Sequence, residues 1–106
     1  MAPKKNWKMS VAKYIALLKR EIHVDRVVVF GSFAKGRARP HSDIDLAVFS
    51  RDFRDKDEIK NMQYLFQRTK DVDTSIEPHP YHPKDLKRAR KGTLLYEIMR
   101  TGKVIL

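Results

Sequence analysis

Cysteine is absent from the 106-residue sequence, which excludes a disulfide framework and a metal site built from thiolates. Long apolar runs are absent too, since no stretch approaches the roughly 20 residues that a membrane-spanning helix needs. The basic residues 1–8 lead into no continuous apolar segment of the kind found in a signal peptide. These absences predict a cytoplasmic protein that works away from membranes.

The chain has the length of one compact domain, since domains typically run to about 100 to 150 residues. We expect residues 1–9 to form a loose basic lead-in and residues 10–106 to form the domain. Lys and Arg number 23 against 13 Asp and Glu, which gives a formal charge of +10. This excess favours phosphate-rich or acidic partners. It does not distinguish a nucleic-acid binder, a nucleotide-handling enzyme and a subunit with an acidic partner.

Apolar periodicity predicts an α-β-α-β-α-β-α order of elements, in which the last helical part contains two consecutive helices. Apolar residues at helical spacing, or short stretches bounded by glycine or proline, predict helices over 10–22, 33–35, 55–69, 83–90 and 94–101. Runs rich in β-branched residues, or alternating in polarity, predict strands over 25–30, 43–49 and 71–77. This order is typical of an α/β or α+β domain with a small mixed β-sheet flanked by helices.

Individual residues set the expected limits of these elements. Ser10 is the expected N-cap of the first helix, and Gly36 and Gly102 are expected to end later helices. Ile59, Met62 and Phe66 step by three and four, which predicts that their side of the third helix packs on the sheet. Pro78 and Pro80 would interrupt a central strand, so the third strand should end near Glu77.

Two aspartates carry the clearest chemical signal. Asp43 and Asp45 stand at i and i+2 on a predicted strand, so both side chains should project to the same side. Two carboxylates so close repel each other, and a cation relieves that repulsion. Oxygen ligands of this kind suit Mg²⁺ or Mn²⁺, with substrate phosphates and water completing the shell.

A phosphate site is predicted ten residues before this pair. Gly31 and Ser32 follow an apolar strand directly and precede a predicted short helix, where backbone N–H groups and the helix dipole attract phosphate oxygens. A further carboxylate on the third strand would complete an acidic cluster and accept a proton from an acceptor hydroxyl. Asp73 and Glu77 are the main candidates for this position, with Asp71 as a weaker third.

These two motifs together resemble a known signature. The runs Gly-Ser-Phe-Ala-Lys-Gly at 31–36 and Ser-Asp-Ile-Asp-Leu at 42–46 are similar to the motifs of the DNA polymerase beta nucleotidyltransferase superfamily, in particular its minimal, stand-alone members. The resemblance implies that Asp43 and Asp45 bind the metal ions and that Gly31, Ser32 and Lys35 hold the triphosphate. It also implies a third acidic ligand, for which Glu77 in Ile-Glu-Pro-His-Pro fits the minimal members better than Asp73.

The same resemblance implies a donor and a partner. Minimal members are often paired with a small helical HEPN protein, and the family includes antitoxins that add AMP to a tyrosine of their toxin partner. We therefore expect transfer of AMP from ATP to a hydroxyl of a HEPN-type protein, by a monomer or an oligomer. The alternatives are transfer to RNA or to a small molecule, a non-catalytic antitoxin that masks its partner, and an RNA-binding module.

Two other groups of residues are interpreted as structural. His23, His41, His79 and His82 have no cysteine to complete a zinc shell, so surface or loop positions are expected for them. The basic residues between Lys84 and Lys91 are expected to form a solvated helix face, with contact to RNA or to an acidic partner as the alternative.

Overall fold

A computed structural model describes residues 7–36 and 42–106 of the chain. Its elements are α1 (Trp7–Lys19), β1 (Arg26–Phe30), β2 (Ile44–Phe49), η1 (Asp55–Asp57), α2 (Glu58–Thr69), β3 (Ile76–Tyr81), η2 (Pro83–Arg88), α3 (Leu94–Thr101) and β4 (Lys103–Val104), where η marks a 3₁₀ helix. The strands form one sheet in the order β3-β2-β1-β4. Strand β1 is antiparallel to β2 and β4, whereas β2 and β3 are parallel. The predicted mixed sheet flanked by helices is confirmed.

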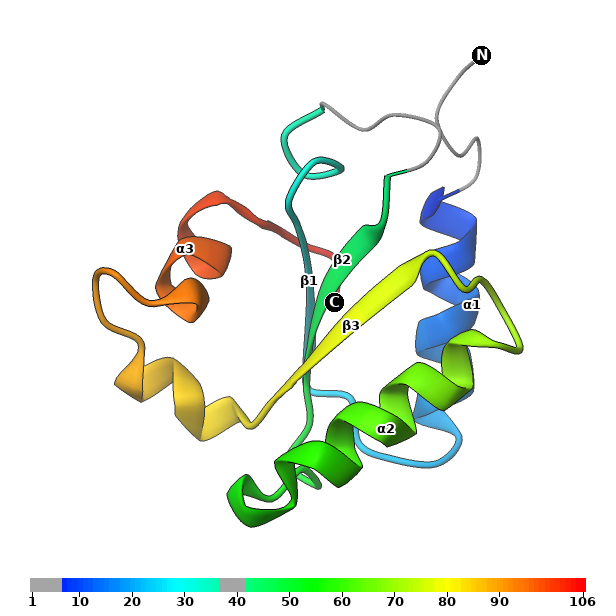
Figure 1. Cartoon of the computed structure of the whole chain (residues 1–106), viewed down its shortest axis with the longest axis horizontal. Coiled ribbons are helices and arrows are strands. Elements are labelled where there is room, and N and C mark those ends of the chain that lie inside the picture. The colour runs from blue at the N-terminus through cyan, green and yellow to red at the C-terminus, as the bar shows by residue number, and fades with distance from the viewer. Residues whose placement is uncertain (1–6, 37–41) are drawn as a thin grey trace.

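Each face of the sheet has its own apolar layer, because successive strand residues point to opposite sides. Val27 and Val29 face the larger layer, which includes the buried side of α1 and Leu65 of α2. Val28 faces the smaller layer, which Leu95 and Ile98 of α3 complete. In Figure 1, α1 and α2 accordingly lie on one side of the sheet, and α3 lies on the other.

A buried hydrogen bond joins the two helices of the larger layer. The Tyr14 hydroxyl donates to the carbonyl oxygen of Leu65 over 2.7 Å. Burial of this hydroxyl raises the pKa of Tyr14 far above its ordinary value, so it remains a donor. The bond fixes α1 against α2 beneath the strands that carry the predicted site.

The first two predicted helices differ from the structure. Helix α1 begins at Trp7, three residues before the predicted N-cap Ser10. The Trp7 ring packs 5.4 Å from the ring of Phe33, which accounts for the earlier start. The predicted helix over 33–35 is a turn, in which the Lys35 N–H donates to the Gly31 carbonyl. Gly36 closes this turn with a φ of 69°.

Strand β3 runs from Ile76 to Tyr81, through both prolines, so the prediction that it would end near Glu77 is wrong. β3 is an edge strand with β2 as its neighbour. The carbonyls of Ser75 and Tyr81 accept hydrogen bonds from β2 and from the residue after it. Backbone groups alternate along a strand, so the nitrogens of Pro78 and Pro80 face the free edge, where proline is tolerated.

A fourth strand and the buried side of α2 were not predicted. Lys103 and Val104 pair with β1, so the C-terminal residues contribute β4. In α2 the buried residues are Leu65 and Thr69. Ile59 is 75% exposed and Phe66 is 41% exposed, so the prediction that their side packs on the sheet is wrong.

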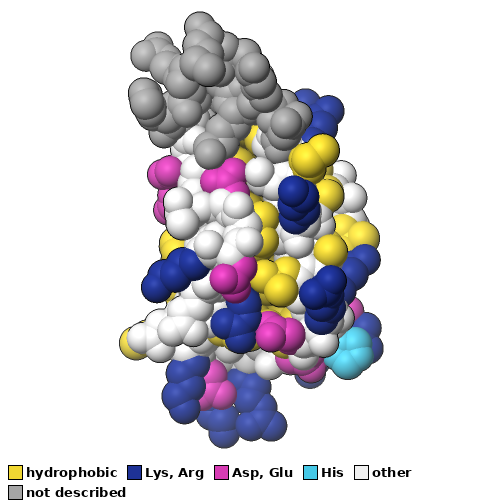
Figure 2. Space-filling model, turned by 90° about the vertical axis from the view of Figure 1, so that its right-hand side faces the viewer, with side chains coloured by type: hydrophobic (Ala, Val, Ile, Leu, Met, Phe, Trp, Pro, Cys, Tyr) yellow, Lys and Arg dark blue, Asp and Glu magenta, His cyan; other side chains and the backbone are white. Residues whose placement is uncertain are grey.

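The surface of the α1 and α2 side is mixed in character. Figure 2 shows Lys and Arg side chains across this face and gathered at its lower end, with acidic and apolar side chains between them. None of the helices in the described segments is long and apolar enough to cross a membrane.

Candidate active site at the strand ends

Three neighbouring strands bring one residue each to the same row of the sheet. Phe30, the last residue of β1, pairs with Asp45 of β2, and Asp45 pairs with Glu77 of β3. The residues on either side of Asp45, Ile44 and Leu46, are buried in the larger apolar layer. Asp45 therefore projects to the opposite face, beside Glu77.

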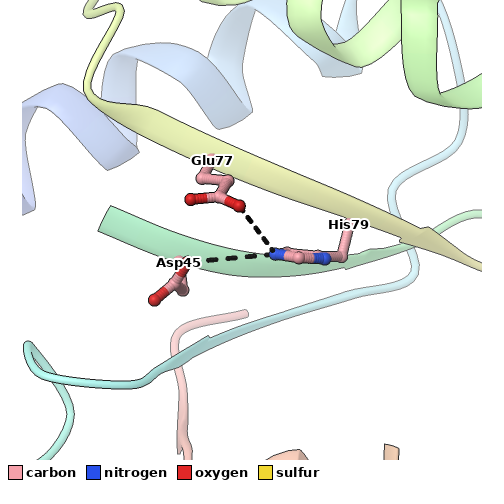
Figure 3. A group of neighbouring side chains, drawn as sticks. All are labelled: Asp45, Glu77 and His79. Carbon is pink, nitrogen blue, oxygen red and sulfur yellow. Dashed lines mark ion pairs between the residues drawn. The ribbon is translucent and has the colours of Figure 1, made fainter. Parts of the chain in front are cut away.

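The side chains in this row are close enough to interact. Ligand atoms of Asp45, Glu77 and His79 all lie within 4.8 Å of one another. His79 Nε2 lies 3.8 Å from Asp45 Oδ1 and 4.0 Å from Glu77 Oε1. Figure 3 shows the three side chains, with Asp45 on β2 and the other two on β3.

Asp43 also reaches this group. Partial burial is the largest cause that raises the pKa of Glu77 above its ordinary value, and the charge of Asp45 is the next. The positive character of His79 partly offsets them, and the charge of Asp43 and its hydrogen bond with Glu77 raise the pKa further. The structure therefore brings together Asp43, Asp45 and Glu77, called here the carboxylate cluster. Three such groups repel one another unless a cation or proton is shared between them.

The turn at 31–36, called here the Gly31 turn, lies directly against the cluster. Gly31 has a φ of 71°, a conformation in which side-chain residues are strained. A Cβ built on Gly31 would lie 2.5 Å from Asp45 Oδ2, closer than real contacts of this kind. Glycine is therefore required at position 31 for two reasons, the backbone conformation and the close approach of the Asp45 side chain.

The remaining predicted residues lie in different surroundings. Asp73 lies in the turn before β3, where its Oδ1 accepts hydrogen bonds from the Ser75 N–H and hydroxyl over 2.9 and 2.6 Å. Of the two candidate third carboxylates, Glu77 is thus the one placed beside Asp45. Lys35 is exposed, and its charge contributes, after the hydrogen bond from Arg100, to lowering the pKa of Glu97 on α3.

Comparison with known families agrees with this arrangement. Residues 12–106 match the sequence profile of the family described as Polymerase beta, Nucleotidyltransferase. The chain belongs to the polymerase beta nucleotidyltransferase family. A crystal structure of a candidate nucleotidyltransferase from Sulfolobus solfataricus has the same fold, with a TM-score of 0.55 and 20% sequence identity. The similarity covers 93% of this chain and 83% of that one, and no curated protein matches the chain.

The donor atoms of this nucleotidyltransferase domain fit a divalent cation. Asp45 and Glu77 supply oxygens that hard divalent ions prefer, and they converge within reach of a single ion. His79 Nε2 faces both carboxylates and has no hydrogen-bond partner among the described residues, although the atom is buried. A cation would relieve the repulsion and satisfy this nitrogen.

His79 was missed as a member of the site. The sequence interpretation ended the strand at Glu77 and placed His79 in a loop or on the surface, whereas it lies on β3 and is half-buried. Its position two residues after Glu77 was the signal, because i and i+2 share one side of a strand. His82 instead caps η2, where its Nδ1 accepts from the Lys84 N–H, so the two histidines do not converge. His41 lies outside the described residues.

The surface of the nucleotidyltransferase domain also has a basic hollow at the opposite ends of β2 and β3. It measures about 530 Å³, and its cationic lining residues are Arg51, Arg54, Lys56, Lys84 and Arg88. The residues after β2 and those of η2 thus form one surface. The solvated helix face predicted over 84–91 is a 3₁₀ helix, η2, followed by a turn.

Proposed function

We propose that this chain is a metal-dependent nucleotidyltransferase that transfers a nucleoside monophosphate from a nucleoside triphosphate to an acceptor hydroxyl. The observation that carries this proposal is the pairing of Asp45 with Glu77 across β2 and β3, beside the Gly31 turn. Membership of the family supports the reaction class. Catalysis needs acidic ligands and a phosphate-binding turn at one place, and the position of the Gly31 turn against Asp45 supports this role for it.

The proposed roles follow from position. Asp43, Asp45 and Glu77 would hold the divalent ions, which we expect to be Mg²⁺ or Mn²⁺. Bound ions of this kind stabilise the charge that develops on the attacking and leaving oxygens. Gly31 and Ser32 would hold phosphate oxygens with their backbone N–H groups and the serine hydroxyl, with help from the exposed Lys35.

The chemical step balances as a displacement at phosphorus. The acceptor oxygen forms a bond to the α-phosphorus, the bond from that phosphorus to the oxygen bridging to the β-phosphate breaks, and pyrophosphate leaves. The proton of the acceptor hydroxyl passes to a carboxylate of the cluster. Glu77 is proposed for this role, because it lies on the strand beside Asp45 and its side chain is 43% exposed against 25% for Asp45.

For the finer reaction we propose transfer of AMP from ATP to a hydroxyl of a HEPN-type partner protein. The motif resemblance at 31–36 and 42–46 supports this acceptor. The exposure of Asp45 and Glu77 leaves the cluster accessible to a macromolecule. The formal charge of +10 favours an acidic partner surface.

The test uses ATP labelled in adenine, a divalent ion and the product of a neighbouring HEPN gene. We expect label on the partner protein with the wild type and with Asp57→Asn, a control at the start of α2. Asp43→Asn and Asp45→Asn should transfer at least about 100-fold less. Wild-type protein that labels nothing, or site variants that label as well as wild type, would exclude the proposal.

A second acceptor, RNA, is favoured by one observation, the basic hollow with its five cationic lining residues. Label recovered in RNA in the same assay, and lost at raised salt, would assign the chain to this acceptor. Partner neutralisation that survives replacement of both Asp43 and Asp45 would instead identify a non-catalytic masking protein.

A further inference from the structure

His79 is held in a fixed orientation beside the carboxylate cluster. It stands two residues after Glu77 on β3 and pairs with Ala47 of β2. Its ring contacts the ring of Phe30, with centroids 5.1 Å apart and planes inclined by 57°. Figure 3 shows that Nε2 of His79 points toward Asp45 and Glu77, and this atom is buried from solvent.

The distances around Nε2 are too long for hydrogen bonds. Nitrogen-to-oxygen hydrogen bonds span about 2.7 to 3.2 Å, whereas Nε2 lies 3.8 Å from Asp45 and 4.0 Å from Glu77. Two ligand atoms that each lie about 2.1 Å from one ion are separated by roughly 3 to 4 Å. The observed spacing therefore matches atoms that share a cation better than atoms that share a proton.

The burial of Nε2 gives a second reason for a ligand. A buried polar atom without a partner costs free energy, so native structures almost always satisfy such atoms. Among the described residues none donates to or accepts from this nitrogen. Imidazole nitrogen is a ligand that Mn²⁺, Co²⁺, Ni²⁺ and Zn²⁺ accept, whereas Mg²⁺ prefers an all-oxygen shell.

We propose that His79 supplies, through Nε2, a nitrogen ligand to the cation held by Asp45 and Glu77, and that this ligand makes the site select first-row transition ions over Mg²⁺. This inference rests on the proposed function for the identity of the site. It assigns to the chain a mixed nitrogen and oxygen shell, in which His79 joins the carboxylates inferred from the motifs. Among transition ions, affinity should rise from Mn²⁺ to Co²⁺.

The test is calorimetric titration of the purified chain with CoCl₂, MnCl₂ and MgCl₂, without nucleotide, together with visible absorption of the Co²⁺ complex. We expect Co²⁺ to bind at least about 10-fold more tightly than Mg²⁺. His79→Gln should lower Co²⁺ affinity by roughly 10-fold or more and weaken the Co²⁺ absorption, while Mg²⁺ affinity changes by less than about twofold. His23→Gln, which removes an exposed histidine bonded to Asp52, should match the wild type.

Equal Co²⁺ affinity in wild type and His79→Gln would overturn the inference, as would equal losses for Co²⁺ and Mg²⁺. Nitrogen-15 spectra of the wild-type histidines during Zn²⁺ titration keep the test valid if the variant does not fold. Coordination must then shift Nε2 of His79, and an unshifted resonance would overturn the inference. The metal titration contains no nucleotide, so its result is independent of the labelled-ATP assay. Selective binding of Co²⁺ by a protein that transfers no nucleotide would refute only the proposed function. Nucleotide transfer by a protein that does not prefer Co²⁺ over Mg²⁺ would refute only the role of His79.

Discussion

Replacement of Gly31 by alanine isolates the contact between the Gly31 turn and Asp45. An alanine at a φ of 71° costs about 1 to 2 kcal/mol for the backbone alone. Its Cβ would start 2.5 Å from Asp45 Oδ2, and since real contacts stay beyond 3.0 Å, Asp45 must move by at least about 0.5 Å. The crowding adds roughly 1 to 3 kcal/mol, so we expect the free energy of unfolding to fall by about 2 to 5 kcal/mol in total.

Gly36→Ala is the matched control. Gly36 has a φ of 69°, yet no atom of the described residues lies within 4 Å of a Cβ built there. The Gly36→Ala variant should therefore lose about 1 to 2 kcal/mol of its free energy of unfolding and keep its metal affinity. Gly31→Ala should in addition bind metal and transfer nucleotide roughly 10-fold to 100-fold less well, because Asp45 is displaced.

Urea unfolding of both variants measures the free energy of unfolding, and calorimetric titration measures metal affinity. The difference between the two variants reports the Asp45 contact, since their backbone costs are nearly equal. Equal losses of stability together with equal metal affinities would refute the argument that Gly31 is required by the approach of Asp45.

Three further predictions concern the site and its supports. Glu77→Gln should reduce nucleotide transfer at least about 100-fold. Asp73→Asn weakens the bonds to Ser75, so it should retain transfer within about threefold but unfold at lower urea concentration. The reverse order of activities would make Asp73 the third carboxylate. Gly102→Ala should cost about 1 to 3 kcal/mol in urea unfolding, because its Cβ would lie 2.5 Å from both Ile98 O and Val28 Cγ1; an unchanged midpoint would contradict this packing. The hydrogen bond from Arg51 lowers the pKa of Asp25 in the folded protein. The contribution of this bond to the free energy of unfolding should therefore be fully present above about pH 3.9, the ordinary pKa of Asp in the unfolded chain. It should be lost as the pH falls through the lower pKa of the folded state. The stability difference between wild type and Asp25→Asn should shrink over that range, and a constant difference would exclude the ion pair as its cause.

The carboxylate cluster was largely predictable because its signals are local. Asp43 and Asp45 stand two residues apart on one strand, and Gly31-Ser32 directly follows another. These two local motifs indicate metal and phosphate binding before any tertiary contact is known. The choice of Glu77 over Asp73 is different, since it depends on the register between β2 and β3. Asp73 lies only two residues before Ser75, and this local turn keeps it off the strand.

Other features depended on contacts between distant segments. Pro78 and Pro80 argue against a central strand, but β3 is an edge strand, and only the strand order reveals this. His79 was misplaced for the same reason. Helix α2 carries two apolar sides, and periodicity favoured Ile59 and Phe66, whereas the sheet buries Leu65. The pairing of β4 with β1 joins residues about 75 positions apart, a distance over which periodicity carries no information.

The most direct test of the central claim compares ATP labelled at the α-phosphorus with ATP labelled at the γ-phosphorus, in the presence of Mn²⁺ and the partner protein. Nucleotidyl transfer predicts that the α-label reaches the acceptor, that the γ-label leaves in pyrophosphate, and that Asp45→Asn abolishes both. Transfer of the γ-label to the acceptor, or release of pyrophosphate that is unaffected by Asp45→Asn, would contradict the assignment of the carboxylate cluster as a nucleotidyltransferase site.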